Sequence, residues 1–70
     1  MKKIYPRIRL LREERHLSQR GLSGLLNMNA TQYARYERGD SVIPVEFMER
    51  LADYFNVSTD YILGRTDIKQ

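Results

Sequence analysis

A short segment near the middle of the chain carries hydrogen-bonding side chains at a helical spacing. At 100° per residue, a helix over residues 30–38 turns Thr31, Arg35 and Arg38 to one side, with Gln32 on the flank. The opposite side would pack, and its members are Tyr33, Tyr36 and Glu37. Arg can pair with two acceptors of guanine, Gln with adenine, and Thr with the methyl group of thymine. The outward side chains therefore have the chemistry to read base edges of DNA, although the pattern also fits the plain surface of a small helical protein.

The residues before this segment predict a tight turn. Asn27 tolerates the left-handed backbone conformation, Met28 supplies an apolar contact, and Asn29 can cap the helix that follows. With Gln32 three residues later, Asn29 resembles a capping box, so Gln32 is assigned equally to a cap and to a base contact. A three-residue turn thus leads into the helix at residue 30.

A weaker helix precedes the turn. Ser18 is a good N-cap, but Gly21 and Gly24 each disfavour the helix by roughly 0.8–1 kcal/mol relative to Ala, so tertiary packing must hold it. Its apolar residues follow an i, i+3, i+4 spacing and are Leu22, Leu25 and Leu26. Two helices joined by a short turn, the second with polar residues outward, are typical of a helix-turn-helix whose second helix enters the DNA major groove.

Another helix is predicted ahead of this unit, over residues 6–15. Pro6 suits its first turn, and His16 ends it because His accepts a left-handed backbone more readily than most residues. Its apolar stripe consists of Ile4, Ile8 and Leu11.

Two more helices follow the central unit. Pro44 opens the first and Asn56 ends it, and Ser58 or Thr59 caps a last short helix that stops at Gly64. The apolar face of the longer helix consists of Val45, Met48, Leu51, Ala52 and Phe55. Five helices with short connections and no alternating strand pattern predict an all-α fold, a compact five-helix bundle.

The composition limits the chain to one small domain. Its 70 residues predict a single domain over residues 1–64 with a short C-terminal tail over residues 65–70 that has no assignable pattern. There is no Cys and only one His, so we expect neither a disulfide framework nor a metal site. No apolar stretch approaches the roughly 18 residues of a membrane span, and we expect a soluble, cytoplasmic protein with no membrane partner.

Charge is distributed unevenly along the chain. Residues 1–38 carry nine Lys or Arg and three Glu, a net charge of +6. Residues 39–70 carry three Lys or Arg and six Asp or Glu, a net charge of −3. A basic half favours a polyanionic partner, since summed charge steers association, although a basic helix can also be a solvated face.

Catalytic chemistry has little support in the sequence. Glu13 and Glu14 are adjacent and cannot face one pocket from a helix, and the serines have no base placed beside them. A bundle of this size also has little volume for a substrate cleft. We therefore expect a protein that is not an enzyme and binds no cofactor.

The ordered set of residues resembles a known family. Its members here are Leu17-Ser18-Gln19, Leu22, Leu25-Leu26, Met28-Asn29, Tyr33, Tyr36-Glu37-Arg38-Gly39 and the runs 51–58 and 61–67. Over residues 4–67 the chain is similar to the phage-repressor family of Cro-like and lambda-repressor-like, or Xre, helix-turn-helix proteins. The resemblance implies a lambda-repressor-like five-helix domain of bacterial or phage origin that binds operator DNA as a transcriptional regulator, with the repressor role expected.

The resemblance also assigns roles to individual residues. The positions that face bases are Ala30, Thr31, Gln32 and Arg35. The positions expected to contact phosphates are Ser18, Gln19, Arg20, Asn29 and Arg38. Glu37 matches a family Glu that pairs with an Arg of the first helix, and Arg12 is the matching position. Asp40 and Ser41 stand where many relatives carry Lys or Arg, so loop amides or Arg38 would have to replace that phosphate contact.

Besides double-stranded DNA, the sequence leads to one expected partner and one alternative. A second copy is the first, because small domains of this kind gain affinity by binding two half-sites of a two-fold-symmetric operator. The candidate dimer surfaces are Leu10 and the pair Phe47 and Tyr54. Either can instead be part of a wide core face, which is the favoured interpretation for Phe47 and Tyr54. The alternative is an antitoxin or switch protein that acts mainly through a protein partner. RNA binding is a weaker alternative, because Tyr33 and Tyr36 face inward and offer no stacking platform.

Overall fold

The computed structural model describes residues 4–69, and within that range it contains helices and no strands. The helices are α1 (Pro6–Glu14), α2 (Gln19–Leu25), α3 (Ala30–Arg38), α4 (Val45–Phe55) and α5 (Thr59–Leu63). The predicted all-α fold is confirmed. The first helix ends at Glu14, one residue earlier than predicted.

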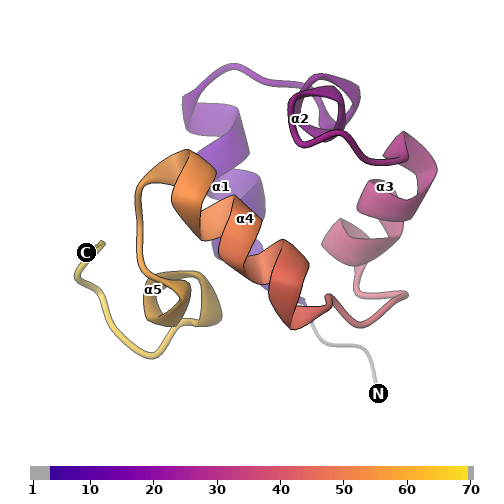
Figure 1. Ribbon diagram of the computed structural model, residues 1–70. Helices are drawn as coiled ribbons and strands as arrows, with labels where there is room; N and C mark the ends of the chain where they lie inside the picture. Colours follow the sequence, from indigo (N-terminus) through magenta and orange to yellow (C-terminus); the bar gives the residue numbers. More distant parts are fainter. Residues whose placement is uncertain (1–3, 70) are drawn as a thin grey trace.

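The five helices pack into a body of 29 × 29 × 20 Å. α2 and α3 lie together on one side, while α5 and the C-terminal tail lie on the other side of α1 and α4 (Figure 1). No helix within residues 4–69 is long and apolar enough to cross a membrane, and α4, the longest of them, has 11 residues. The helix pair predicted to carry the chemistry therefore sits at one edge of the molecule.

Three helices begin with the polar caps that the sequence predicts. The Ser18 hydroxyl accepts a hydrogen bond from the Gly21 N–H at 2.9 Å, and Asn29 Oδ1 accepts one from the Gln32 N–H at 3.1 Å. Ser58, rather than Thr59, caps α5 by accepting from the N–H of Tyr61 at 3.0 Å. Each cap satisfies one N–H that the first turn of a helix leaves without a partner.

All five helices end in the same backbone arrangement. One residue takes the left-handed conformation, and the N–H of the next residue bonds a carbonyl five positions back, which is the Schellman pattern. The left-handed residues have φ between 56° and 82° and are His16, Asn27, Gly39, Asn56 and Gly64. The matching bonds run from Leu17 to Arg12, Met28 to Ser23, Asp40 to Arg35, Val57 to Ala52 and Arg65 to Asp60. The sequence prediction that His16 and Asn27 end helices is thus confirmed.

The core draws on all five helices and corrects one predicted surface. Phe47 was a candidate for a dimer surface, but its side chain is only 6% exposed and packs against Tyr36 and Tyr33, with ring centroids 5.4 and 6.3 Å away. It is a core residue, because the Tyr side chains of α3 lie directly over this part of α4. Tyr54 is half-buried beside Phe55, and Leu10 remains exposed on α1.

Three residues expected on core stripes lie on the surface. Ile4, Leu25 and Val45 are 54%, 58% and 75% exposed. Each lies at or just outside a helix end. Periodicity predicts that the apolar stripe continues to this point, but no neighbouring helix covers the side chain there. In α2 a buried Ser23, whose hydroxyl donates to the Arg20 carbonyl, lies inward together with Leu22.

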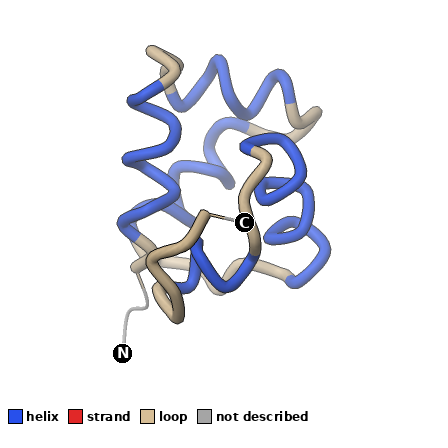
Figure 2. Tube along the Cα trace, turned by 90° about the vertical axis from the view of Figure 1, so that its left-hand side faces the viewer, coloured by secondary structure: helices blue, strands red, loops and turns tan. Residues whose placement is uncertain are grey.

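The C-terminal tail folds back on the body. Arg7 donates to the carbonyls of Tyr61 and Thr66 and forms an ion pair with Asp67 at 2.6 Å. The N–H of Ser58 bonds the carbonyl of Lys69 at 2.6 Å, so the end of the tail lies beside the connection between α4 and α5 (Figure 2). A segment without sequence periodicity is therefore held by side-chain bonds from Arg7 of α1 and by a backbone bond from Ser58, the N-cap of α5.

Candidate nucleic-acid interface

The α2-turn-α3 unit places its polar residues as the helical spacing predicts. Thr31 and Arg35 are exposed on α3, whereas Tyr33 and Tyr36 are buried on its opposite side. Ala30 and Gln32 are half-buried at the flanks of the exposed face. One side of α3 is thus committed to the core and the other is open along its length.

Gln32 contributes only half of the predicted capping box. Its backbone N–H donates to Asn29, but within residues 4–69 its side-chain amide has no hydrogen-bond partner. The amide therefore keeps both its donors and its acceptor for a contact outside the chain. The sequence assigns the side chain of Gln32 either to a cap or to a base contact. The structure leaves the side chain available for the base contact.

The candidate phosphate-contact residues differ in how far they are already occupied. Arg20 is exposed, whereas Ser18 uses its hydroxyl as the α2 cap. Gln19 turns inward, and its Nε2 donates to Glu37 Oε1 at 3.0 Å. Arg38 is exposed, but its side chain forms an ion pair with Asp40 at 2.9 Å. This ion pair offsets part of the positive charge of Arg38.

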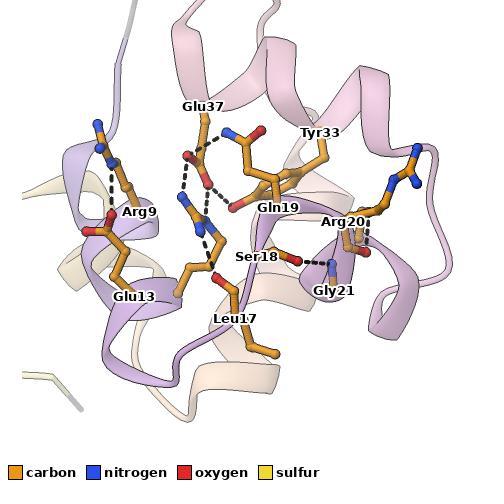
Figure 3. Close-up of polar contacts among 11 residues, drawn as sticks. Arg9, Glu13, Leu17, Ser18, Gln19, Arg20, Gly21, Tyr33 and Glu37 are labelled. Carbon is orange, nitrogen blue, oxygen red and sulfur yellow. Dashed lines mark hydrogen bonds and ion pairs between the residues drawn. The ribbon is translucent and has the colours of Figure 1, made fainter.

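A buried carboxylate lies where α1, α2 and α3 meet. Glu37 accepts hydrogen bonds from Arg12 at 2.7 and 3.2 Å, from Gln19 at 3.0 Å, and from the Tyr33 hydroxyl (Figure 3). The side chains of Glu37 and Arg12 are 6% and 11% exposed. Arg12 Nη1 also donates to the Leu17 carbonyl at 2.7 Å, which ties in the α1–α2 loop. These four side chains, Arg12, Gln19, Tyr33 and Glu37, form the Glu37 cluster.

The cluster keeps its charges paired. Burial alone would raise the pKa of Glu37, but the hydrogen bonds from Arg12, Tyr33 and Gln19 outweigh it and hold that pKa below its ordinary value. Burial, reinforced by the hydrogen bond to Glu37, raises the pKa of Tyr33. The hydrogen bond to Glu37 raises the pKa of Arg12. At neutral pH Glu37 is ionised, and Arg12 and Tyr33 are protonated donors to it.

The Glu37 cluster sets the orientation of the exposed face. It joins one residue of α1, one of α2 and two of α3, so rotation of α3 about its axis would break several bonds at once. The resemblance assigned the Arg12–Glu37 pair, which the structure contains. Sequence reasoning missed the contribution of Gln19 and Tyr33 to it. Tyr33 could have been found, since it precedes Glu37 by four residues and lies on the same helical face.

The arginines of the basic half differ in how far the fold already engages their side chains. Arg7, Arg12 and Arg15 bond backbone carbonyls elsewhere in the fold, and Arg15 also lies over the ring of Tyr54 at 5.1 Å. In contrast, Arg20 and Arg35 form no ion pair within the described part of the chain and are exposed. Among the arginines of the basic half that the structure describes, Arg20 on α2 and Arg35 on α3 are therefore the two whose side chains have no hydrogen-bond or ion-pair partner in the fold.

Comparison with known proteins agrees with this geometry. A family model described as helix-turn-helix matches residues 8–62, which spans α2, the turn and α3 together with most of α1, α4 and α5. The chain belongs to this helix-turn-helix family, of the Xre and lambda-repressor-like type. Searches of curated proteins and of solved structures found no match. The family consists of DNA-binding regulators, and double-stranded DNA is the partner that membership implies.

Proposed function

We propose that this protein is a transcriptional repressor that recognises an operator sequence with α3 in the DNA major groove. The proposal rests on one observation, the open face of α3 with Thr31, Gln32 and Arg35 directed away from the core and without partners in residues 4–69. Most other arginines of the basic half are used within the fold. The repressor role follows from a domain that can block polymerase simply by occupying its site.

Each residue of the open face has a distinct role in this proposal. Arg35 donates two hydrogen bonds to a guanine, Gln32 uses its amide on an adenine, and Thr31 supplies a hydroxyl and a methyl group. Ala30 supplies only a methyl contact. Since these contacts lie at base edges, they determine which sequence is bound.

The phosphate contacts hold α3 in register in the same proposal. The residues that would make them, following the family pattern, are Ser18, Gln19, Arg20, Asn29 and Arg38. Arg20 is the best-placed side chain of this set, because it is exposed and carries an unpaired charge. Contacts of this kind strengthen binding to every sequence alike and make binding sensitive to salt.

The first test is selection of bound duplexes from a random DNA pool at about physiological salt, where non-specific binding is weak. We expect one enriched sequence with two-fold symmetry. Failure to enrich any sequence would overturn the proposal and favour a protein partner instead.

The second test assigns Arg35, with Arg65→Ala as the matched control. Both arginines are exposed, but Arg65 follows α5 on the side of the molecule away from α3. We expect Arg35→Ala to relax discrimination at one base pair by roughly 1–3 kcal/mol, Arg20→Ala to weaken all sequences alike, and Arg65→Ala to change neither. Competition binding with single-base variants of the enriched duplex measures this. Equal losses on every sequence from Arg35→Ala would show a phosphate contact.

A further inference from the structure

A hollow of about 470 Å³ opens between the start of α1 and the end of α3. Its polar wall includes Arg9, which extends from α1 beside the Glu37 cluster (Figure 3), and Arg38 at the end of α3. Its apolar wall includes Tyr5 and Pro6. The volume lies within the roughly 300–1,000 Å³ of typical ligand sites, so the hollow can take a group of about nucleotide size.

The hollow attracts anions. Its lining contains three arginines and one acid, which gives a net charge of +2. The acid is Glu37, and its charge is already balanced by Arg12 within the Glu37 cluster. Arg9 and Arg38 are therefore the cations that can act on a group entering from outside.

Both of these arginines have carboxylate partners that are easily exchanged. Arg9 pairs with Glu13 at 3.2 Å and Arg38 with Asp40 at 2.9 Å, and neither carboxylate lines the hollow. The arginine side chains are 67% and 60% exposed, and exposed pairs of this kind contribute little to stability. A phosphate group accepts charge-assisted hydrogen bonds from guanidinium groups, so it can replace either carboxylate at small cost.

We infer that this hollow holds one sugar-phosphate unit of the DNA backbone, with Arg9 as a phosphate contact from α1. The inference rests on the proposed function and adds to it a residue outside the α2-turn-α3 unit. Arg9 and Arg38 donate to the phosphate oxygens from two different helices, and the rings of Tyr5 and Pro6 lie against the sugar. A free phosphate ion would use the polar wall alone, so the apolar wall favours the sugar-phosphate chain.

The position of the hollow fits the proposed docking of α3. A recognition helix contacts base edges with its N-terminal residues, which here include Thr31 and Gln32. The nine residues of α3 span about 13 Å, and the major groove is about 12 Å wide, so the last turn of α3 reaches the backbone at the edge of the groove. The hollow lies at this end of α3, which brings Arg9 to the same strand.

Asp40 explains why a cation from a second helix matters here. A phosphate beside Arg38 alone would also lie near the carboxylate that pairs with Arg38. Arg9 adds a positive charge from α1, on the other side of the hollow. The pair of arginines therefore outweighs the acid beside one of them.

The first test uses the two members of one ion pair, Arg9 and Glu13. We expect Arg9→Ala to weaken binding to the selected duplex and to random duplexes alike, by about tenfold, and to lower the slope of log affinity against log salt by about 1. Arg9→Lys should keep the slope. Glu13→Gln removes the competing carboxylate, so it should bind at least as tightly as wild type. Arg65→Ala, which changes the net charge equally, should leave the slope unchanged.

The second test locates the phosphate. Single phosphates of the selected duplex are replaced in turn by neutral methylphosphonates, and affinities are measured for wild type, Arg9→Ala and Arg65→Ala. We expect one position at which the replacement weakens binding by wild type and Arg65→Ala but has no further effect on Arg9→Ala. At every other position the three proteins should respond alike.

Three results would overturn the inference. The first is an Arg9→Ala that loses no more affinity than Arg65→Ala, and the second is a Glu13→Gln that loses as much as Arg9→Ala, because the ion pair alone would then matter. The third is a shift of the Arg9 Nε–H resonance that saturates with thymidine monophosphate while Arg9→Ala still binds duplex normally, which would assign the hollow to a free nucleotide.

The outcome is separable from that of the proposed function. If a sequence is enriched but Arg9→Ala binds it normally, operator recognition stands and the role of Arg9 fails. If no sequence is enriched but Arg9→Ala weakens binding to random duplexes at low salt, the phosphate contact stands and operator recognition fails.

Discussion

The two halves of the molecule are held together by different kinds of interaction. The α1–α3 half is joined by the Glu37 cluster, in which a buried carboxylate accepts bonds from all three helices. The α4–α5 half is held by apolar packing around Phe47, Leu51 and Phe55, which are at most 6% exposed. The open face of α3 belongs to the first half.

This difference reflects what each half must do. Apolar packing is strong but non-directional, whereas a carboxylate that accepts four bonds requires its donors in particular positions. The open face of α3 has to be held at one rotation relative to α2, and the Glu37 cluster provides that directional constraint. The α4–α5 half contributes apolar burial to a core that draws on all five helices.

Removal of the central carboxylate should give the largest effect. Glu37→Ala leaves the buried guanidinium of Arg12 and the hydroxyl of Tyr33 without their acceptor. We expect a loss of about 3–5 kcal/mol in the free energy of unfolding, as for other broken buried pairs. Urea unfolding followed by circular dichroism measures it.

The matched control for this variant is Glu13→Ala. Glu13 also pairs with an arginine, Arg9, but both side chains are largely exposed. Exposed i, i+4 pairs contribute roughly 0.3–0.5 kcal/mol, so this variant should stay close to the wild-type stability. An unfolding midpoint for Glu37→Ala as high as that of Glu13→Ala would contradict the role of the Glu37 cluster.

Acid should weaken the first half selectively. Because the folded pKa of Glu37 is lowered, its ionisation stabilises the fold above its unfolded pKa, and this contribution is lost as the pH falls through the folded pKa. Wild-type stability should therefore decline below about pH 5, and Glu37→Gln should show a shallower decline. Urea midpoints collected from pH 7 to pH 3 test this.

Leu51→Ala supplies the contrast from the second half. Leu51 is fully buried in the core, so its truncation should cost about 2–5 kcal/mol through lost burial and the cavity left behind. The side chain has no proton to exchange, so the cost should be the same at each pH. If the urea midpoint of Glu37→Gln declines with acid as steeply as those of the wild type and Leu51→Ala, other carboxylates control the acid sensitivity.

Local chemistry made much of the fold predictable. The caps at Ser18 and Asn29 and the helix ends at His16 and Asn27 depend on short-range backbone preferences, and all four were found from sequence. Periodicity failed at helix ends, as Val45 shows, because exposure there depends on neighbouring helices that are distant in sequence.

The sequence predicted which residues of the candidate site are exposed or buried on α3, but it predicted fewer of the contacts between the site and other segments. Helical spacing separates the exposed Arg35 from the buried Tyr33 without any tertiary information. The inward turn of Gln19 and the burial of Phe47 against α3 both depend on packing between segments that periodicity treats independently.

The smallest expected effect concerns the helix that the Glu37 cluster must hold in place. α2 has two glycines among seven residues, and a Cβ added at Gly24 meets no atom within 4 Å. Gly24→Ala should therefore stabilise the protein by roughly 0.5–1 kcal/mol through helix propensity alone. Gly21→Ala should gain less, because its Cβ would lie 3.2 Å from the capping hydroxyl of Ser18.

Gly64→Ala is the opposite control for this series. Gly64 has φ of +82°, which L side chains rarely adopt, so the same added methyl group should lower the unfolding midpoint although space is open around it. If Gly24→Ala raises the midpoint and also halves the destabilisation caused by Glu37→Ala, the Glu37 cluster acts partly by offsetting the weakness of α2. Additive effects would instead show that the cluster orients α2 and α3 without contributing to the formation of α2 itself.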